Sequence, residues 1–476
     1  MLFNSIDFAI FLPIVFFLFW FHSNNIKWQN IIIFVSNYIF YGWWDWKFLS
    51  LIFLSTLIDY FVGIKIFESD NQTIRKRFLY LSIFSNLGIL CFFKYYNFFI
   101  ENFITAFSLF GLKPSIYTLN IILPAGISFY TFQTLSYSID VYKNKLTPCK
   151  DIIVFSSFVS FFPQLVAGPI ERASNLLPQF SIKKTFDIEN ASSGLKQILW
   201  GLFKKVVIAD NCAFYVNTIF GDYENLNGST LFIGAIFFTF QIYGDFSGYS
   251  DIAIGTAKLF GFDLMKNFYY PYFSRDIAEF WRRWHISLST WFRDYLYIPL
   301  GGSRGNLSSK IRNTFIVFIV SGFWHGANWT FIFWGILHSL YFLPLLLSKK
   351  NRNNIDIVAQ GKIIPNIKDI FNITFTFILV VIGWIFFRSE TLSDSFRYIQ
   401  IIFSKSLFEV PTVRPTILFV ILFVFIFLEW IGREKNFPLE SFFSNNRYAR
   451  WFTYYILVIL IFVFSKSNQQ FIYFQF

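Results

Sequence analysis

Long apolar segments that carry almost no charge recur along the chain. Near its start they cover residues 6–21, 30–44, 48–67 and 78–93. A helix of about 20 apolar residues crosses the hydrocarbon core of a bilayer, and about 17 residues are enough. The pattern predicts an all-α, polytopic membrane protein with roughly eleven transmembrane helices. The first segment lacks a preceding basic residue and a following small-residue cleavage site, so we expect it to remain as a span rather than to be cleaved as a signal peptide.

Composition agrees with this interpretation. Charged residues make up 14% of the chain, against about 25% in soluble proteins, and the mean hydropathy is +0.50. No linker is long enough to divide the chain, so we expect one membrane-embedded domain over residues 1–476. The spacing of the three cysteines fits neither a metal site nor a redox pair, and no metal is expected.

The basic residues predict the orientation. The net charge of +12 comes from Lys and Arg residues in the loops between apolar segments. The positive-inside rule describes this distribution, and we therefore reject a nucleic-acid partner. The loop 65–77, which contains Lys65, Arg75, Lys76 and Arg77, is placed in the cytoplasm. Counting back three spans places the N-terminus outside.

Two apolar segments, 152–170 and 100–112, do not read as simple spans, and segment 100–112, which contains Glu101, is expected to lie at the surface of the membrane. Segment 152–170 is apolar, but basic loops flank it and it ends with Pro163, Gly168 and Pro169. Proline and glycine break helices, so a re-entrant or interfacial segment is expected. Segment 263–312 interleaves Lys and Arg with Trp and Tyr. This composition predicts short amphipathic helices at the cytoplasmic interface of the membrane rather than a span.

Four histidines are present, and His325 is the best placed for chemistry. It lies between two apolar runs, where an ionisable residue is costly and therefore a functional candidate. Gly322 and Gly326 flank it four residues apart, which either lets another helix approach closely or lets the chain open around the imidazole. A structural histidine remains an alternative. His285 lies in the basic block, where a plain surface role is the alternative, and His338 is expected to be a hydrogen-bonded core residue.

Two carboxylates, Asp245 and Asp251, lie in an apolar neighbourhood. Buried carboxylates need partners, and arginines such as Arg282 or Arg293 could form ion pairs with them. Alternatively, the carboxylates line a substrate tunnel. The chain contains no P-loop, HExxH, dinucleotide or GxSxG motif, which argues against nucleotide hydrolysis, metalloprotease chemistry and a hydrolase triad.

The motifs together resemble those of a known family. Trp324-His325-Gly326 in an apolar segment follows the block 281–285 (WRRWH). Further matching motifs are 123–133 (LPAGISFYTFQ), 162–170 (FPQLVAGPI), 293–302 (RDYLYIPLGG) and 471–476 (FIYFQF). The chain thereby resembles the membrane-bound O-acyltransferases (MBOAT) over nearly its whole length. The likeness is to the bacterial subgroup of alginate O-acetylases and peptidoglycan O-acetyltransferases, and teichoic-acid D-alanyl transferase is a more distant relative.

The resemblance implies an MBOAT fold and an acyl-transfer site. The family's catalytic histidine maps onto His325 and its second histidine onto His285. Candidate substrate-binding residues are Trp324, Asn328, Asp245, Tyr249, Arg282 and Arg293. A histidine base would take the proton of the acceptor hydroxyl.

The resemblance also implies the substrates and partners. Acetyl-CoA or another acyl thioester would enter from the cytoplasm as the donor substrate, with no bound cofactor, and the basic block 263–312 could attract its phosphates. The acceptor would be a cell-envelope polysaccharide outside the inner membrane, reached with an extracytoplasmic esterase-like partner. D-alanyl transfer to teichoic acid is one alternative, and acylation of a lipid or protein is another. A transporter is a third, although the two similar halves typical of transporters are not seen.

Overall fold

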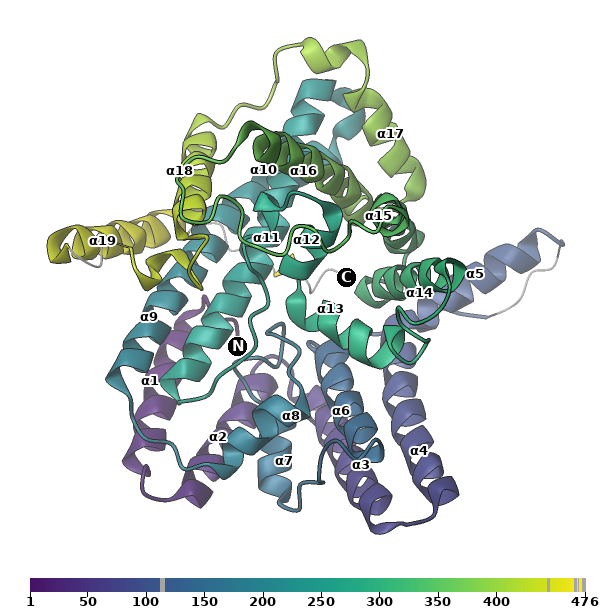
Figure 1. Ribbon diagram of the computed structural model, residues 1–476, viewed down its shortest axis with the longest axis vertical. Coiled ribbons are helices and arrows are strands. Elements are labelled where there is room, and N and C mark those ends of the chain that lie inside the picture. Colours follow the sequence, from purple (N-terminus) through teal and green to yellow (C-terminus); the bar gives the residue numbers. More distant parts are fainter. Residues whose placement is uncertain (112–115, 443–445, 466–468, 470, 473–476) are drawn as a thin grey trace. The chain divides into compact units, whose positions relative to one another are not determined.

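The computed structural model describes residues 1–476 except 112–115, 443–445, 466–468, 470 and 473–476 (Figure 1). The described residues form helices and turns, with no β-strand among them, which confirms the expected all-α class. Residues 473–476 of the closing motif lie outside the described part. The chain forms two compact units, 1–194 with 256–265 and 195–255 with 266–476. The expectation of a single domain stays a prediction.

The first unit contains the N-terminal helices. They are α1 (Ile6–Phe21), α2 (Ile26–Gly42), α3 (Leu49–Glu68), α4 (Gln72–Leu90), α5 (Tyr96–Ser108), α6 (Ile127–Tyr142), α7 (Ile152–Val159) and α8 (Ala173–Leu176). Asn25, Asn71 and Asp151 begin α2, α4 and α7 by accepting hydrogen bonds from first-turn amides, because the first amides of a helix lack partners within it.

The second unit contains the remaining helices. They are α10 (Asp210–Gly221), α12 (Ile277–Arg283), α13 (Ile286–Phe292), α14 (Leu307–His325), α15 (Trp329–Leu347), α16 (Ile367–Arg388), α17 (Leu392–Ile402), α18 (Thr416–Gly432) and α19 (Arg447–Phe464). Two helices, α9 (Ile188–Leu202) and α11 (Gly228–Leu259), contribute residues to both units.

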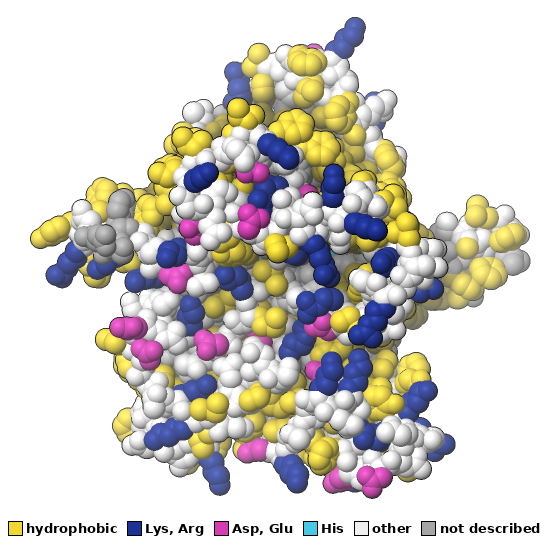
Figure 2. Space-filling model, viewed as in Figure 1, with side chains coloured by type: hydrophobic (Ala, Val, Ile, Leu, Met, Phe, Trp, Pro, Cys, Tyr) yellow, Lys and Arg dark blue, Asp and Glu magenta, His cyan; other side chains and the backbone are white. Residues whose placement is uncertain are grey.

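Six helical stretches are long and apolar enough to cross a membrane. They are Trp46–Glu68, Gln72–Ser108, Gly228–Leu259, Trp329–Leu347, Ile367–Arg388 and Arg447–Phe464, and two shorter apolar helices are Ile6–Phe21 and Thr416–Gly432. Many large hydrophobic side chains are exposed on the surface (Figure 2), as expected where lipid rather than water surrounds a protein. A multi-pass membrane protein is therefore supported. The count of about eleven spans and the orientation stay predictions.

Segments 152–170 and 263–312 differ in how closely the structure follows the prediction. Helix α7 stops at Val159, after eight residues, and the chain from Ser160 to Ile170 is not helical. The expected break in segment 152–170 is thus confirmed, while its depth in the membrane stays a prediction. Segment 263–312 does form the short helices α12 and α13, followed by the π-helical turn Arg293–Tyr297. Its last residues were predicted wrongly, because residues 307–312 begin the long helix α14.

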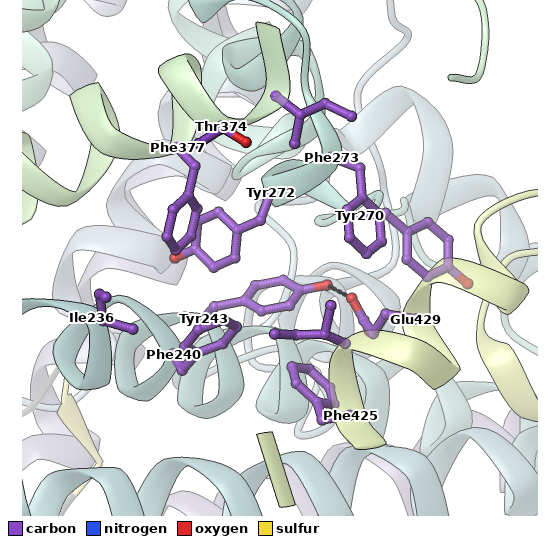
Figure 3. A pocket seen from close by; sticks show the side chains of 12 residues that line it. Ile236, Phe240, Tyr243, Tyr270, Tyr272, Phe273, Thr374, Phe377, Phe425 and Glu429 are labelled. Carbon is purple, nitrogen blue, oxygen red and sulfur yellow. Dashed lines mark hydrogen bonds between the residues drawn. The ribbon is translucent and has the colours of Figure 1, made fainter. Parts of the chain in front are cut away.

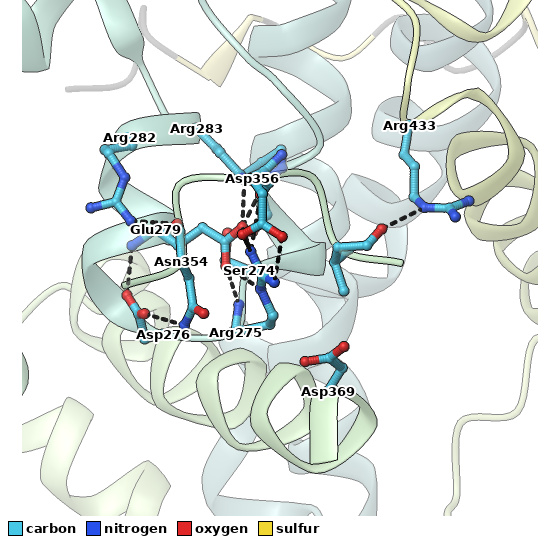
Figure 4. A network of polar contacts seen from close by, with 12 residues as sticks. Ser274, Arg275, Asp276, Glu279, Arg282, Arg283, Asn354, Asp356, Asp369 and Arg433 are labelled. Atoms are coloured by element: carbon cyan, nitrogen blue, oxygen red, sulfur yellow. Dashed lines mark hydrogen bonds and ion pairs between the residues drawn. The ribbon is translucent and has the colours of Figure 1, made fainter. Parts of the chain in front are cut away.

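Ion pairs fasten α12 to the loop after α15 (Figure 4). Arg275 bridges Glu279 at 3.1 Å and Asp356 at 2.9 Å, and Glu279 also pairs with Arg283 at 2.7 Å. The Arg275 guanidinium lowers the pKa of the Asp356 carboxyl. Arg275, which precedes α12, and Arg283, within it, thus share the buried Glu279 and hold the block in place.

Candidate active site

His325 is the last residue of α14, and aromatic rings enclose its imidazole. Ring centroids lie 5.0 Å from Trp324, 5.3 Å from Trp334 and 5.3 Å from Phe387. The side chain is buried. A titratable group is thus held where water is largely excluded, at the point where the helix ends and Gly326 follows as its C-cap.

Glycines explain why α14 and α15 bring these rings together. A Cβ atom on Gly322 would overlap the carbonyl oxygen of Phe331, and one on Gly335 would overlap the carbonyl oxygen of Phe318. Only glycine allows two helices to approach this closely. The expected close approach of another helix at Gly322 is confirmed. The chain also leaves the helix directly after His325, so the alternative, that the chain opens around the imidazole, holds in part.

His285 lies beside this cluster. Its ring centroid is 6.4 Å from that of His325 and 6.0 Å from that of Trp324. The side chain is 1% exposed, so the alternative of a plain surface role is wrong. Its backbone occupies the left-handed region, with φ of 43° at the N-cap of α13. A non-glycine residue in that region carries a conformational cost, and such residues cluster at functional sites.

A hydrogen-bond network built on Asn267 fixes the His285 imidazole. Its Nδ1 lies 3.0 Å from Oδ1 of Asn267, which also accepts a hydrogen bond from the Ser287 hydroxyl at 2.8 Å. The amide nitrogen of Asn267 donates to the Ser250 hydroxyl at 3.0 Å. Because Oδ1 is an acceptor, Nδ1 of His285 carries the proton, and Nε2 has the lone pair.

Burial decides the charge of this histidine. It lowers the pKa of the His285 imidazole to about 3, because removing the ring from water disfavours its charged form. His285 is therefore neutral at physiological pH. Asn267 was missed by the sequence reasoning, because an asparagine 18 residues before the histidine carries no signal of its own.

Trp324 and Asn328 differ in their relation to the histidines. Trp324 contacts both His285 and His325. Asn328 instead caps α15 by accepting a hydrogen bond from the Thr330 amide, and its amide nitrogen donates to the carbonyl oxygen of Glu390 at 2.8 Å. Its observed contacts therefore order the loop that follows His325.

The carboxylates of α11 pair with lysines. Asp245 lies 2.7 Å from Lys205, which also holds Asp210 at 2.8 Å, and Asp251 lies 2.5 Å from Lys204. The expected ion pairing is confirmed, but the suggested partners, Arg282 and Arg293, were wrong. The physical reason is a close crossing of two helices at glycine residues, which no local pattern in the sequence reveals.

Gly201 and Gly248 set that crossing. A Cβ on Gly248 would lie 2.8 Å from the Gly201 carbonyl oxygen, so α11 lies directly against the helix that carries Lys204 and Lys205. Asp245 also accepts a hydrogen bond from the Ile472 amide at 2.7 Å, and the ring of Tyr249 lies 5.0 Å from that of Phe471. These contacts give Asp245 and Tyr249 a structural role in this part of the second unit.

The two arginines make their contacts elsewhere. Arg282 donates to the carbonyl oxygens of Asn351 and Asn354 at 2.8 and 2.7 Å. Arg293 is 59% exposed and pairs with its neighbour Asp294. Of the candidate residues, the structure thus brings together His285, Trp324 and His325.

His338 is a core histidine, as expected. It is fully buried, and the indole nitrogen of Trp281 donates to its Nδ1 at 3.3 Å. Among the described residues, no group of three or more His, Cys, Asp or Glu side chains could hold a metal ion.

Comparison with known proteins places this site in a wider context. The sequence model of the membrane-bound O-acyltransferase family matches residues 48–387. The probable alginate O-acetylase AlgI of Pseudomonas putida is 41% identical, over 85% of this chain and 80% of that protein. The peptidoglycan O-acetyltransferase of Helicobacter pylori is 36% identical, over 84% of this chain and 79% of that protein. The teichoic acid D-alanyltransferase of Streptococcus thermophilus is 32% identical, over 56% of this chain and 69% of that protein.

Proposed function

The chain belongs to the membrane-bound O-acyltransferase family, and from this premise we propose that it transfers an acetyl group from acetyl-CoA to a hydroxyl group of a cell-envelope polysaccharide. The observation that carries the proposal is the pair of buried imidazoles, His285 and His325, 6.4 Å apart between ring centroids with Trp324 against both.

His325 acts as the general base in this proposal. It takes the proton of the acceptor hydroxyl while the hydroxyl oxygen attacks the thioester carbonyl; the carbon–sulfur bond then breaks and the thiol leaves with a proton. Such a base contributes about 10²–10⁴-fold to the rate. His285, neutral and held in one tautomer by Asn267, presents Nε2 as an acceptor beside the base. It orients the acceptor molecule through a second donor group, because the proton of the reacting hydroxyl is directed at His325.

The donor and acceptor approach from opposite sides of the membrane. Acetyl-CoA enters from the cytoplasm, where exposed basic residues of segment 263–312, such as Arg293, attract its phosphates. The acceptor polysaccharide lies outside the inner membrane, and an extracytoplasmic esterase-like partner assists transfer of the acetyl group to it. The orientation with the N-terminus outside belongs to the same proposal.

The relatives favour acetyl over D-alanyl transfer. The two O-acetyl-transferring relatives match 84–85% of the chain, whereas the D-alanyltransferase matches 56%. The alternative that the chain is a transporter is not retained, because the chain is an O-acyltransferase.

The test replaces His325 by glutamine, which keeps hydrogen bonding but cannot act as a base near neutral pH. Polysaccharide acetylation, measured as acetate released by mild alkali, is expected to fall at least about 100-fold. The matched control is His338→Gln, which alters a buried histidine of the same unit and should cost stability while leaving the chemistry in place. Wild-type acetylation by a well-inserted His325→Gln protein would refute the base role.

A further inference from the structure

A cavity of about 350 Å³ lies in the second unit between α11, α16 and α18. Its walls are mainly aromatic and aliphatic, and Figure 3 shows the rings of Phe240, Tyr272, Phe377 and Phe425 around it. None of the candidate catalytic residues lines it. The cavity is therefore a feature separate from the histidine pair, and the reaction leaves it without a role.

Three tyrosines line the cavity, and two of them already have hydrogen-bond partners. The Tyr243 hydroxyl donates to Glu429 at 2.6 Å, and the Tyr272 hydroxyl donates to the carbonyl oxygen of Thr239 at 2.6 Å. A polar ligand would have to break these buried bonds, which is costly. The lining is therefore mainly apolar and suits a molecule that makes contact mostly through CH groups, and the buried Tyr270 hydroxyl is the lining hydroxyl that has no partner among the described residues.

The cavity opens on the lipid-facing surface of the helices. Thr374 of α16 is exposed, and Ile426 of α18 is 38% exposed, and both line the cavity. Next to them Phe375 and Phe423 are 55% and 72% exposed. Both helices are apolar and α16 is long enough to cross a membrane, so the medium outside the opening is bilayer hydrocarbon.

We propose that this cavity binds one hydrocarbon chain of a membrane phospholipid. Its volume would hold about twelve methylene groups, taking each as similar to the ~30 Å³ of a liquid water molecule. The occupant is a constituent of the surrounding bilayer, so it binds whether or not the enzyme is turning over. The proposal is independent of the acyl donor and acceptor.

The test uses the full-length protein in vesicles of phosphatidylethanolamine and phosphatidylglycerol. A small fraction of the lipid carries a photoreactive diazirine midway along one chain, and labelled positions are read by peptide mass spectrometry after irradiation. We expect labelling of Phe377 and Phe425, inside the cavity. In Thr374→Trp, an indole fills the opening and this labelling should be lost. Phe375→Trp, one residue along on an exposed face, is the matched control and should retain it.

Three results would overturn the proposal. One is cavity labelling that Thr374→Trp leaves unchanged. A second is labelling confined to exposed residues such as Phe423 in the wild-type protein. A third is labelling of the cavity by a diazirine-bearing acyl-CoA and not by the phospholipid. If Thr374→Trp fails to insert, Ile426→Trp closes the same opening from α18 and is judged by the same criteria.

Discussion

Replacing Asn267 with alanine would remove the side chain that holds the His285 imidazole in place. Asn267 is fully buried, and its amide contacts His285, Ser287 and Ser250 at 2.8–3.0 Å. The substitution leaves these groups without the amide in a space that water does not readily enter. We therefore expect Asn267→Ala to lower both the stability of the protein and the rate of acyl transfer.

The structure supports a rough magnitude. Each buried polar group that loses its partner costs about 1–3 kcal/mol. The hydroxyls of Ser250 and Ser287 can rotate toward other acceptors, whereas the His285 ring cannot do so without leaving its position. About 1.4–2.8 kcal/mol of lost positioning at the imidazole corresponds to a 10- to 100-fold slower reaction.

Asn267→Asp separates positioning from folding. The carboxylate keeps the size of the side chain and still accepts from His285, but its charge favours the imidazolium and raises the pKa of His285 from about 3. The acidic limb of the pH–rate profile should therefore move toward neutral pH. The assay measures polysaccharide acetylation across pH at matched amounts of folded protein. Wild-type rates and an unshifted profile in both variants would refute the role of Asn267.

Three further predictions follow from burial and packing. Burial lowers the pKa of His285 from 6.5 to about 3, so the unfolded chain binds this proton at a higher pH than the folded chain does. As the pH is lowered from about 6.5, the free energy of unfolding should therefore fall by roughly 1.4 kcal/mol per pH unit. Thermal melts of His285→Gln should show less sensitivity to acid than those of the wild-type protein. Gly322→Ala should cost about 1–3 kcal/mol of stability and reduce acetylation, whereas Gly88→Ala, with open space around it, should do neither. Lys205→Met should destabilise by about 3–5 kcal/mol in melts, because two carboxylates lose their cation, and adding Asp245→Asn should restore part of the loss; an equally stable single variant would contradict this.

Hydropathy located the N-terminal helices well and their polar ends less well. The apolar segment 6–21 coincides with α1, and 48–67 nearly coincides with Leu49–Glu68. Helix α4, however, begins at Gln72, six residues before the apolar run at 78. The Asn71 cap and the first polar turn belong to the helix without adding to its hydropathy, so a pattern of apolar residues cannot detect them.

The sequence motifs predicted the histidines of the candidate site, but not the ion pairs formed by the nearby carboxylates. The residues around His325 and His285 identified both histidines. The lysine partners of Asp245 and Asp251 could not be foreseen, because they depend on which helices cross at Gly201 and Gly248. A local sequence pattern predicts a helix face, whereas pairing between helices is decided by packing over long sequence separations.

The position of His325 at the very end of α14 has an electrostatic consequence. The final carbonyl groups of a helix have no amide partners within it, and the C-terminus carries about half a negative elementary charge. When the base accepts the hydroxyl proton, its new positive charge forms in the last turn of a 19-residue helix. Such placement stabilises a cation by about 0.3–1 kcal/mol, and by more where water is excluded. The backbone of α14 would thereby serve as a fixed partial counter-charge that favours the protonated form of the base over the neutral form.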